Sequence, residues 1–300
     1  MAENKKSRQR HCGHRLPTLV EHVQSILQKY PDGGQILKEL IQNADDAGAT
    51  EVSFLFDERN HGVTSLESPD LASFQGPALY CHNNATFKEQ DWDGIRNLMK
   101  SNKKEDPLKI GRFGIGFNSV YHITDLPSIA SGDRIAFLDP HEEYFRNEKG
   151  RGSSVTMYYF DENLLQEETR DQFMPFQDVF GCDLKDSEKY EGTLFRFPLR
   201  TKASELSKEG YSEEKVLKLF DSLQTEASVV LLFLKNICSI SLHKRFKNGE
   251  MECSFKVEIS DDSRDEVSKR RQEFLSKATK KSEISDSSYV MNVKVMKGST

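Results

Sequence analysis

Apolar residues in the first part of the chain follow first a helical and then an extended pattern. They recur every three or four positions in residues 17–30 and again in residues 34–47, and this period predicts two amphipathic helices. Pro31 and two glycines separate these segments, and Gly48 follows the second one. Residues 51–57 are rich in β-branched and aromatic side chains, which predicts a short strand directly after the second helix.

The remaining chain is mostly extended in pattern, with a few helical segments. Helices are predicted over residues 91–99, 117–123 and 213–235, whereas residues 61–76 have the composition of a loop. An Asn-Gly pair at 248–249 is a good hairpin signal between two predicted strands. The segments predicted as strands are residues 78–81, 135–138, 155–160, 192–198, 240–243, 255–259 and 290–295.

This order of elements predicts an α/β (α+β) fold of two layers, in which helices cover one face of a mixed sheet. At about 150 residues per domain, a chain of 300 residues has room for two domains. We expect residues 1–15 to form a flexible basic tail and residues 16–245 to form the main domain. Residues 246–300 are expected to form a β-hairpin and a charged extension, with the start of a following domain as one interpretation.

Charge and cysteine content narrow the function classes. The chain has 42 Lys and Arg against 48 Asp and Glu, and this net charge of −6 argues against a general nucleic-acid binder. Its five cysteines are odd in number and widely spaced, which favours reduced thiols in the cytoplasm over a secreted disulfide scaffold. The longest apolar run, residues 229–234, is far shorter than the roughly 20 residues of a membrane helix, so we expect no membrane partner.

The predicted helix over residues 34–47 carries the first candidate site. Glu39, Asn43 and Asp46 are spaced by four and three positions, so they share a helix face that is separate from the apolar stripe. Two carboxylates and an amide suit a hard cation and a positioned water, with Asn43 as a neutral ligand for Mg²⁺ and Glu39 as a proton acceptor. An ordinary polar helix face has the same spacing, and the pattern alone does not separate the two interpretations.

Two further segments place glycines beside predicted elements. Residues 111–116 hold three glycines ahead of the helix predicted over 117–123, and exposed backbone N–H groups at a helix start favour a phosphate. The spacing fits neither a P-loop nor a dinucleotide-binding fingerprint, and a tight packing loop is the alternative. Gly192 and Thr193 begin a predicted strand, which by itself says little.

Together, and in this order, the three segments resemble the GHKL (Bergerat-type) ATP-binding fold. That fold is shared by the ninety-kilodalton heat-shock chaperones, type II topoisomerases, mismatch-repair ATPases and sensor histidine kinases. The chain resembles still more closely the chaperone-like repeat module of the sacsin (Sacsin/Nov) family, over about residues 15–243. The stretches that carry this resemblance are YPDGGQILKELIQNADDAGATEV, QGPALYCHNNATF, DPLKIGRFGIGFNSVYHITD and FRFPLR.

The resemblance implies ATP or ADP with Mg²⁺ as the bound cofactor. It implies that Glu39 is the water-activating base, Asn43 the Mg²⁺ ligand and Asp46 a carboxylate of the nucleotide pocket. Thr193 is implied to lie near the adenine end. The residues implied to line the triphosphate are those of the glycine-rich segment, Gly111, Arg112, Phe113, Gly114, Ile115, Gly116 and Phe117.

One motif of the family is degenerate in this chain. Where the family carries Asp-x-Gly-x-Gly to hold the adenine amino group, the matching stretch contains neither the aspartate nor the glycines. Asn83 or Asn84 offers adenine a neutral oxygen instead, which gives roughly half the strength of a charge-assisted bond. Ala85 and Thr86 add side-chain bulk in place of the glycines, so we expect weak nucleotide binding.

The function implied by the resemblance is a chaperone-type nucleotide-binding module in cytoplasmic protein folding and quality control. Residues 100–111 leave little chain for a lid over the nucleotide, so slow or absent hydrolysis of ATP is expected. The expected partners are nucleotide and client proteins or co-chaperones, without nucleic acid, and membership of a larger multi-repeat protein is left open. The alternative is a nucleotide-independent protein-interaction scaffold with a degenerate pocket.

Overall fold

The computed structural model describes residues 17–98, 116–146, 149–161, 164–279 and 291–298, and these are built around one mixed sheet. The strands are β1 (Glu51–Asp57), β2 (Ala78–Asn83), β3 (Ser128–Gly132), β4 (Arg134–Leu138), β5 (Val155–Tyr159), β6 (Tyr190–Pro198), β7 (Ser239–Arg245), β8 (Met251–Ile259) and β9 (Val293–Lys297). They lie in the order β5-β4-β3-β6-β2-β1-β7-β8-β9. Among these described strands, β1 and β7 pair in parallel and the other neighbours are antiparallel.

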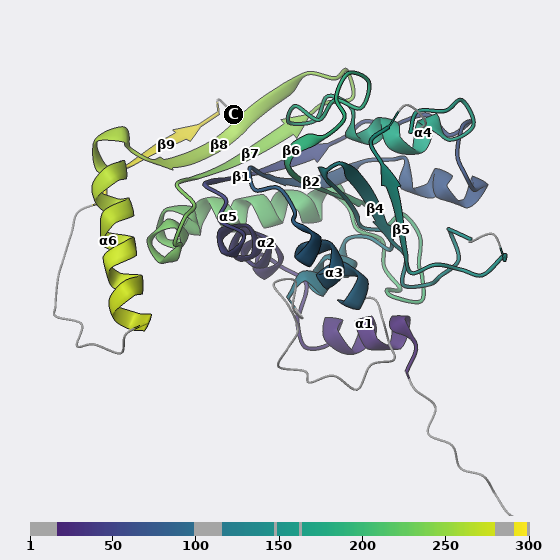
Figure 1. The fold of residues 1–300 in the computed structure, drawn as a ribbon, viewed down its shortest axis with the longest axis horizontal. Coiled ribbons are helices and arrows are strands. Elements are labelled where there is room, and N and C mark those ends of the chain that lie inside the picture. The colour runs from purple at the N-terminus through teal and green to yellow at the C-terminus, as the bar shows by residue number, and fades with distance from the viewer. Residues whose placement is uncertain (1–16, 99–115, 147–148, 162–163, 280–290, 299–300) are drawn as a thin grey trace, which may run out of the picture.

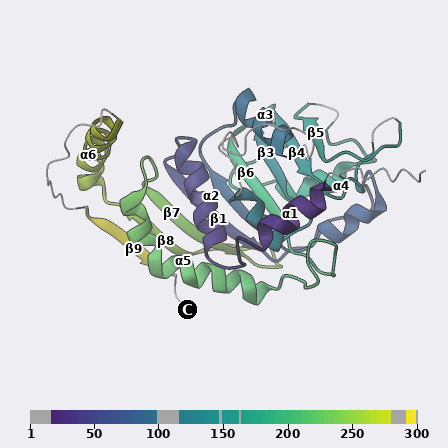
Figure 2. The same ribbon diagram turned by 90° about the horizontal axis from the view of Figure 1, so that it is seen from below.

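Long helices form a layer on one face of this sheet. The helices are α1 (Leu19–Leu27), α2 (Gln35–Asp46), α3 (Glu89–Leu98), α4 (Arg170–Phe173), α5 (Glu213–Phe233) and α6 (Asp261–Thr279), with 3₁₀ helices η1 (Pro69–Phe74), η3 (Phe117–His122) and η4 (Met174–Phe176). In Figures 1 and 2, α1, α2 and α5 lie on the same face, and α6 lies at one end of the molecule near β9.

The larger core lies between the sheet and these helices. Alternate residues of the strands, such as Phe54 and Phe56 of β1, point into it together with the buried side of α5. The apolar stripe that the sequence predicts for α2 is buried against the sheet and comprises Ile36, Leu37, Leu40, Ile41 and Ala44. This burial sets the rotation of α2, because at roughly 25 cal/mol per Å² of apolar surface no other orientation of the helix is competitive.

A second core lies on the opposite face of the sheet. The intervening strand residues, such as Leu55 of β1 and Tyr80 of β2, pack there under η1, α4, η4 and the loops around them. The predicted two-layer α/β fold with long helices on one face is confirmed, and short helices and loops cover part of the other face. The nearly continuous apolar run of β1 reflects this burial on both sides.

Most predicted elements are confirmed, and their ends follow local chemistry. Thr18 caps α1 in a capping box with Glu21, whose carboxylate accepts the Thr18 N–H at 2.7 Å. The second predicted helix ends as α2 at Asp46, and Gly48 after it has a φ of +86°, a left-handed conformation that favours glycine. The predicted hairpin turn after β7 also contains a left-handed glycine, Gly249.

Helix α6, strand β3 and the short helices α4 and η4 were not anticipated. Helix α6 occupies part of the segment expected to be a charged extension; its charged sequence hides a buried side built on Val267 and Arg271. The Arg271 guanidinium donates to the backbone oxygens of Leu231 and Ile237. A buried arginine, rather than an apolar residue, therefore holds this side of α6 against the end of α5 and the segment before β7. Strand β3 was missed because its serines, alanine and glycine have low strand propensity.

Smaller differences concern helix type and boundaries. The helix predicted over 117–123 is the 3₁₀ helix η3, and the predicted loop at 61–76 contains η1. The last strand begins at Val293 rather than at 290. Of the described helices, none combines the length and apolar character that a membrane crossing requires.

The expected domain boundary at residue 245 falls where β7 ends. Strand β8 pairs with β7, and β9 pairs with β8, so the described strands beyond 245 extend the same sheet. The division into a main domain and an extension stays a prediction, and the expected tail at residues 1–15 lies outside the described residues.

Candidate functional site

A small hollow lies where the C-terminal half of α2 faces the end of β2 and the first half of β6. Its lining residues are Asn43, Ala44, Ala47, Asn83, Ala85, Thr86, Phe87, Lys88, Asp91, Thr193 and Phe195. It encloses about 20 Å³, which is room for about one ordered water molecule. The hollow therefore combines residues from three of the segments that sequence analysis singled out.

The polar face predicted for α2 exists in the structure. Glu39, Asn43 and Asp46 are each half-buried, between the buried stripe and the exposed Gln42. Asn43 lines the hollow, and Glu39 lies one helical turn before it. Asp46 does not line the hollow, so the structure separates one of the three implied site residues from the other two.

The Glu39 carboxylate lies against Gly116 at the start of η3. Gln35 Nε2 donates to Glu39 Oε1 at 3.0 Å and so fixes the carboxylate from the preceding turn. A Cβ added to Gly116 would lie 2.6 Å from Glu39 Cδ. Because the φ of Gly116 is an ordinary −62°, glycine is required here by space and not by backbone conformation. The acidic helix face and the end of the glycine-rich segment are thus in direct contact.

Asn43 has a buried amide nitrogen without a partner among the described residues. Its Nδ2 atom makes no hydrogen bond to any described group. Leaving such a buried donor unsatisfied costs roughly 1–3 kcal/mol, and most buried polar groups in folded proteins avoid this penalty. The amide oxygen of Asn43 and the nearby Glu39 carboxylate are the hard ligands that Mg²⁺ prefers. Within the described chain, no cluster of three or more His, Cys, Asp or Glu could hold a metal, so a Mg²⁺ here needs phosphate and water oxygens as well.

The adenine end implied by the resemblance is already hydrogen-bonded within the protein. The Thr193 hydroxyl donates to the Ala85 backbone oxygen at 2.7 Å and lies 2.9 Å from the Ser131 hydroxyl. Ser131 Oγ also donates to Gly192 O and accepts from Phe87 N. Sequence reasoning missed Ser131, because it lies on the unpredicted strand β3, where it pairs with Thr193.

The two asparagines after β2 have different environments. Asn83 lines the hollow, and its Oδ1 accepts the Ala85 N–H at 3.0 Å. Asn84 turns away: its Oδ1 accepts the Thr50 N–H and its Nδ2 donates to the Thr50 hydroxyl, at the start of β1. Of the two proposed adenine contacts, the structure therefore places Asn83 at the hollow and Asn84 in a structural role.

The adjacent aspartates at the end of α2 both have partners within the protein. Asp46 forms an ion pair with Lys235 at 2.7 Å, and both side chains are about a third to a half exposed. Asp45 is buried, and its carboxylate accepts the backbone N–H groups of Lys235, Asn236 and Ile237. Sequence reasoning did not single out Asp45, although it holds the connection between α5 and β7.

Phe117, the exposed Lys88 and the glycine-rich segment complete the description of the site. Phe117 is fully buried, with its ring centroid 5.7 Å from that of Phe195, so it belongs to the core behind the hollow. Lys88 is an exposed cation at the hollow that sequence reasoning missed, although it directly follows the degenerate motif. The residues implied for the triphosphate that lie outside the described chain are Gly111, Arg112, Phe113, Gly114 and Ile115.

Fold and site together define a class of protein: a two-layer α/β protein with a candidate ligand site between a helix of its covering layer and the sheet. Residues 17–258 match the family described as the Sacsin domain. Because this match covers most of the chain, the chain belongs to the Sacsin domain family.

Two individual proteins are similar to this chain. Human (Homo sapiens) Sacsin is 50% identical to it over 252 residues, which cover 83% of this chain and 5% of that protein. The chain thus spans about a twentieth of the length of this curated relative. A crystal structure of the N-terminal domain of a DNA repair protein is 13% identical, covers 78% of this chain and 54% of that chain, and has a TM-score of 0.40, which is too low to support an argument.

Proposed function

We propose that this Sacsin domain is a chaperone-type nucleotide-binding module of the GHKL kind, which binds ATP or ADP with Mg²⁺ weakly and hydrolyses ATP slowly or not at all. In this proposal it acts in cytoplasmic protein folding and quality control, with client proteins or co-chaperones as partners. The four described cysteines, Cys81, Cys182, Cys238 and Cys253, are free thiols, which supports a reducing compartment.

The buried, unpartnered amide of Asn43 is the observation that carries this proposal. A phosphate oxygen at Nδ2 would accept the hydrogen bond that no described residue accepts, and the amide oxygen of the same side chain could then serve as a Mg²⁺ ligand. Bound magnesium nucleotide supplies the phosphate whose transfer to water is the chemistry in question. Glu39, oriented by Gln35, is the residue that would accept a proton from that water.

Weak binding follows from what a nucleotide must displace. The hollow has room for about one water, and the Thr193 hydroxyl and the Asn83 oxygen already have protein partners. Each such bond that opens loses roughly 0.5–1.5 kcal/mol, and 1.4 kcal/mol is a factor of ten in affinity. We therefore expect dissociation constants on the order of 1 mM rather than 1 μM.

Calorimetric titration of ADP and ATP into the purified chain, with and without Mg²⁺, tests the proposal. We expect Mg²⁺-dependent binding in the natural chain and at least a tenfold loss in Asn43→Ala. The same substitution should leave the unfolding free energy without nucleotide unchanged or slightly higher, because it removes an unsatisfied buried group.

Gln42→Ala is the matched control, since Gln42 is exposed on the neighbouring position of the same helix. It should bind nucleotide as the natural chain does. Absence of heat up to several millimolar nucleotide in the folded chain, or equal binding by Asn43→Ala, would overturn the proposal.

The second candidate is a nucleotide-independent scaffold that keeps the fold and docks protein partners. The closed hydrogen-bond set of Thr193, Ser131 and Ala85 favours it, since these groups need no ligand. The unsatisfied Asn43 favours nucleotide binding, since a scaffold gains nothing from it. The titration separates the two, because the scaffold predicts no response to nucleotide in either variant.

A further inference from the structure

A cluster of guanidinium groups lies at the opposite end of the strands from the hollow. Arg245 ends β7 and pairs in the ladder with Asp57, the last residue of β1. Asn83, at the hollow, pairs instead with Val52 at the beginning of β1. Arg59 follows β1 by two residues and completes the cluster from the adjoining loop.

The carboxylate of Asp57 is fully engaged by Arg59. Asp57 is 1% exposed, and it accepts from the Arg59 backbone N–H at 3.0 Å, from Nε at 3.0 Å and from Nη2 at 2.7 Å. The Arg59 side chain is 25% exposed and forms the outer side of the cluster. The negative charge of the buried Asp57 carboxylate is thus balanced by the positive charge of Arg59.

Arg196 on β6 is the second guanidinium of the cluster, and its described hydrogen bonds include none to a carboxylate. It is 3% exposed; its Nε donates to Tyr80 Oη at 3.0 Å and its Nη2 to the Gly76 backbone oxygen at 3.1 Å. Tyr80 in turn donates its hydroxyl to Pro175 O and remains neutral, because burial raises its pKa. The described hydrogen bonds of the Arg196 guanidinium therefore go to neutral oxygen atoms.

Arg245 is the third guanidinium, and it is incompletely bonded. It is 8% exposed, its Nη2 donates to the Asp178 backbone oxygen at 3.0 Å, and its Nε is buried without a partner among the described groups. Gln75, on the adjoining loop, has a buried Oε1 that is likewise without a partner. An unpaired donor on a buried cation is a costly arrangement for a protein to keep.

The charges of the cluster do not balance. Three buried or half-buried guanidiniums face one buried carboxylate, which leaves two positive charges without a buried counter-charge. The exposed carboxylate of Asp178 is the other acidic group near Arg59 and Arg245, and water screens it. The pKa of the neighbouring His61 is lowered to about 4, by burial first and then by Arg196 and Arg59, which reports the same positive potential.

We propose that this cluster is a second binding site, specific for the phosphate group of a small molecule, which is held between Arg59 and Arg245 beside His61. A dianionic phosphate would offset the net charge of +2 that the three guanidiniums and the Asp57 carboxylate leave together, and arginine N–H groups that Asp57 does not engage can donate to its oxygens. The unpaired Nε of Arg245 supplies one donor to this ligand. The site is independent of the hollow and of the function proposed for it.

Titration of inorganic phosphate at constant ionic strength tests the site, with sodium chloride as the compensating salt. The natural chain should show a saturable rise in Tm, and Arg245→Gln should weaken the response at least tenfold. Arg264→Gln, the same change at an exposed arginine of α6, should leave it intact. Asn43→Ala should also leave it intact, which distinguishes this site from phosphate bound at the hollow.

Two further measurements keep the test decisive if Arg245→Gln fails to fold. Arg59→Lys keeps a cation beside the buried Asp57 carboxylate, and it should weaken phosphate binding at least tenfold as well, because the ammonium group lacks the planar set of N–H donors with which Arg59 would contact Asp57 and the phosphate together. In the natural chain, the pKa of His61 followed by NMR should rise from about 4 when phosphate is added, because a nearby dianion favours the charged imidazole. An unchanged His61 pKa, an equal response in both arginine variants, or an equal effect of chloride or acetate would overturn the proposal.

Discussion

At the residue scale, the hollow is governed by which polar groups already have partners. Thr193 and Asn83 are hydrogen-bonded to the segment that follows β2, whereas the Asn43 Nδ2 atom is buried and has no partner in the described part of the chain. In the proposed nucleotide site, the polar groups expected at the adenine end therefore have partners within the protein, whereas the Asn43 Nδ2 atom at the expected magnesium end has none among the described residues. We expect weak binding because a nucleotide would have to break the hydrogen bonds of Thr193 and Asn83.

Restoring the degenerate motif should strengthen nucleotide binding. Asn83→Asp combined with Ala85→Gly provides a charged acceptor for the adenine amino group and removes a side chain from the hollow. A charge-assisted bond is about twice as strong as a neutral one, so we expect roughly a tenfold gain in ADP affinity by calorimetry. Asn84→Asp is the control, because Asn84 bonds Thr50 instead, and it should show no gain. If the double variant binds no better, the degenerate motif is not the cause of weak binding.

Gly116 should tolerate a methyl group only when Glu39 is shortened. In Gly116→Ala the new Cβ would lie 2.6 Å from Glu39 Cδ, so the glutamate must rotate away from Gln35. We expect a loss of about 1 kcal/mol of unfolding free energy in the natural background and almost none in Glu39→Ala. Urea denaturation of the four variants measures this coupling. Equal losses in both backgrounds would show that another neighbour causes the strain.

At the scale of elements, Arg200 fastens η3 to the end of β6. Its guanidinium donates to the backbone oxygens of Tyr121 and His122 and to the Asp125 carboxylate at 2.7 Å. Because η3 begins at Gly116, this contact fixes the element that carries the Glu39 contact. The buried ion pair between Arg200, just after β6, and Asp125 thereby supports the candidate site.

Removing the partner of Arg200 should be severe. In Asp125→Ala a guanidinium that is almost fully buried loses its counter-charge, and such a loss costs about 3–5 kcal/mol. Glu191→Ala, which breaks the exposed pair with Lys189, should cost far less, because water screens both charges. Denaturant unfolding of both variants compares the two costs. Similar small losses would mean that the carbonyl contacts alone hold Arg200.

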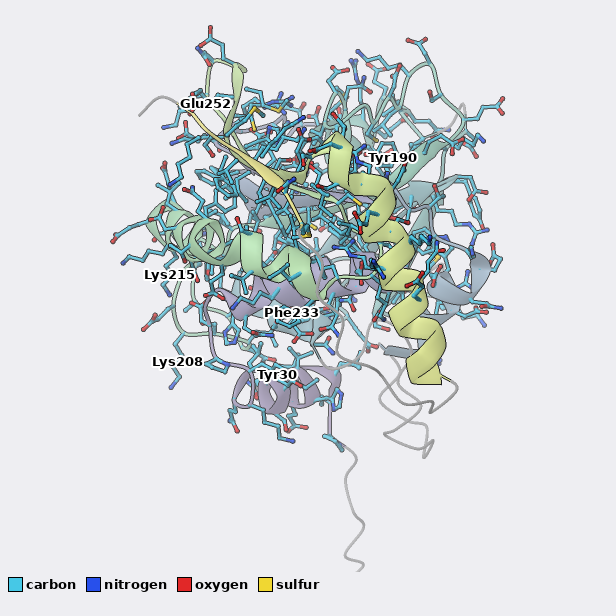
Figure 3. The ribbon with its side chains drawn as sticks, turned by 90° about the vertical axis from the view of Figure 1, so that its left-hand side faces the viewer. Tyr30, Tyr190, Lys208, Lys215, Phe233 and Glu252 are labelled. Carbon is cyan, nitrogen blue, oxygen red and sulfur yellow. The ribbon has the colours of Figure 1, made fainter. Side chains whose placement is uncertain are left out.

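At the scale of the whole molecule, the two faces of the sheet differ in chemistry. The face under short helices and loops contains the buried His82, Arg196 and Arg245, whereas the buried charged groups Asp45 and Arg271 lie on the side of the long helices. His82, for example, stacks on Phe180 with 5.1 Å between ring centroids. Figure 3 shows a further feature at this scale: Phe233, which is 80% exposed, lies at the end of α5 close to α6.

Mild acid should therefore destabilise the chain. Burial lowers the pKa of both His61 and His82 to about 4, below the usual 6.5, so the unfolded state binds more protons between those values. Stability is complete above about pH 6.5 and falls as the pH drops toward 4. At pH 5 the loss is on the order of 2 kcal/mol for each histidine relative to pH 7.

Denaturant unfolding at pH 7 and pH 5 measures this effect. His82→Gln should reduce the difference between the two pH values by about 2 kcal/mol, whatever its effect at pH 7. Solvent-exposed His22 provides the matched control, because His22→Gln should leave the difference unchanged. A pH response that is the same in both variants would mean that His82 is protonated in the folded chain.

A structural feature of this protein can be predicted from the sequence when the residues that determine it lie close together in the chain. The periods of α1, α2 and α5 and the apolar run of β1 are local, and the structure agrees with them. The face shared by Glu39 and Asn43 follows from helix geometry alone. By contrast, β3 has no propensity signal, and the charged sequence of α6 conceals a helix held by Arg271.

The amino-acid sequence by itself determined the family, the helical layer, the strands of strong propensity and the polar face of α2, because each depends on residues near one another in the chain. The tertiary structure decided which polar groups find partners. It paired Asn84 with Thr50 and Asp46 with Lys235, brought Thr193 against Ser131, and left Asn43 Nδ2 and Arg245 Nε without partners among the described residues. These outcomes depend on strand pairing and loop closure over long sequence separations, where no local pattern carries the information.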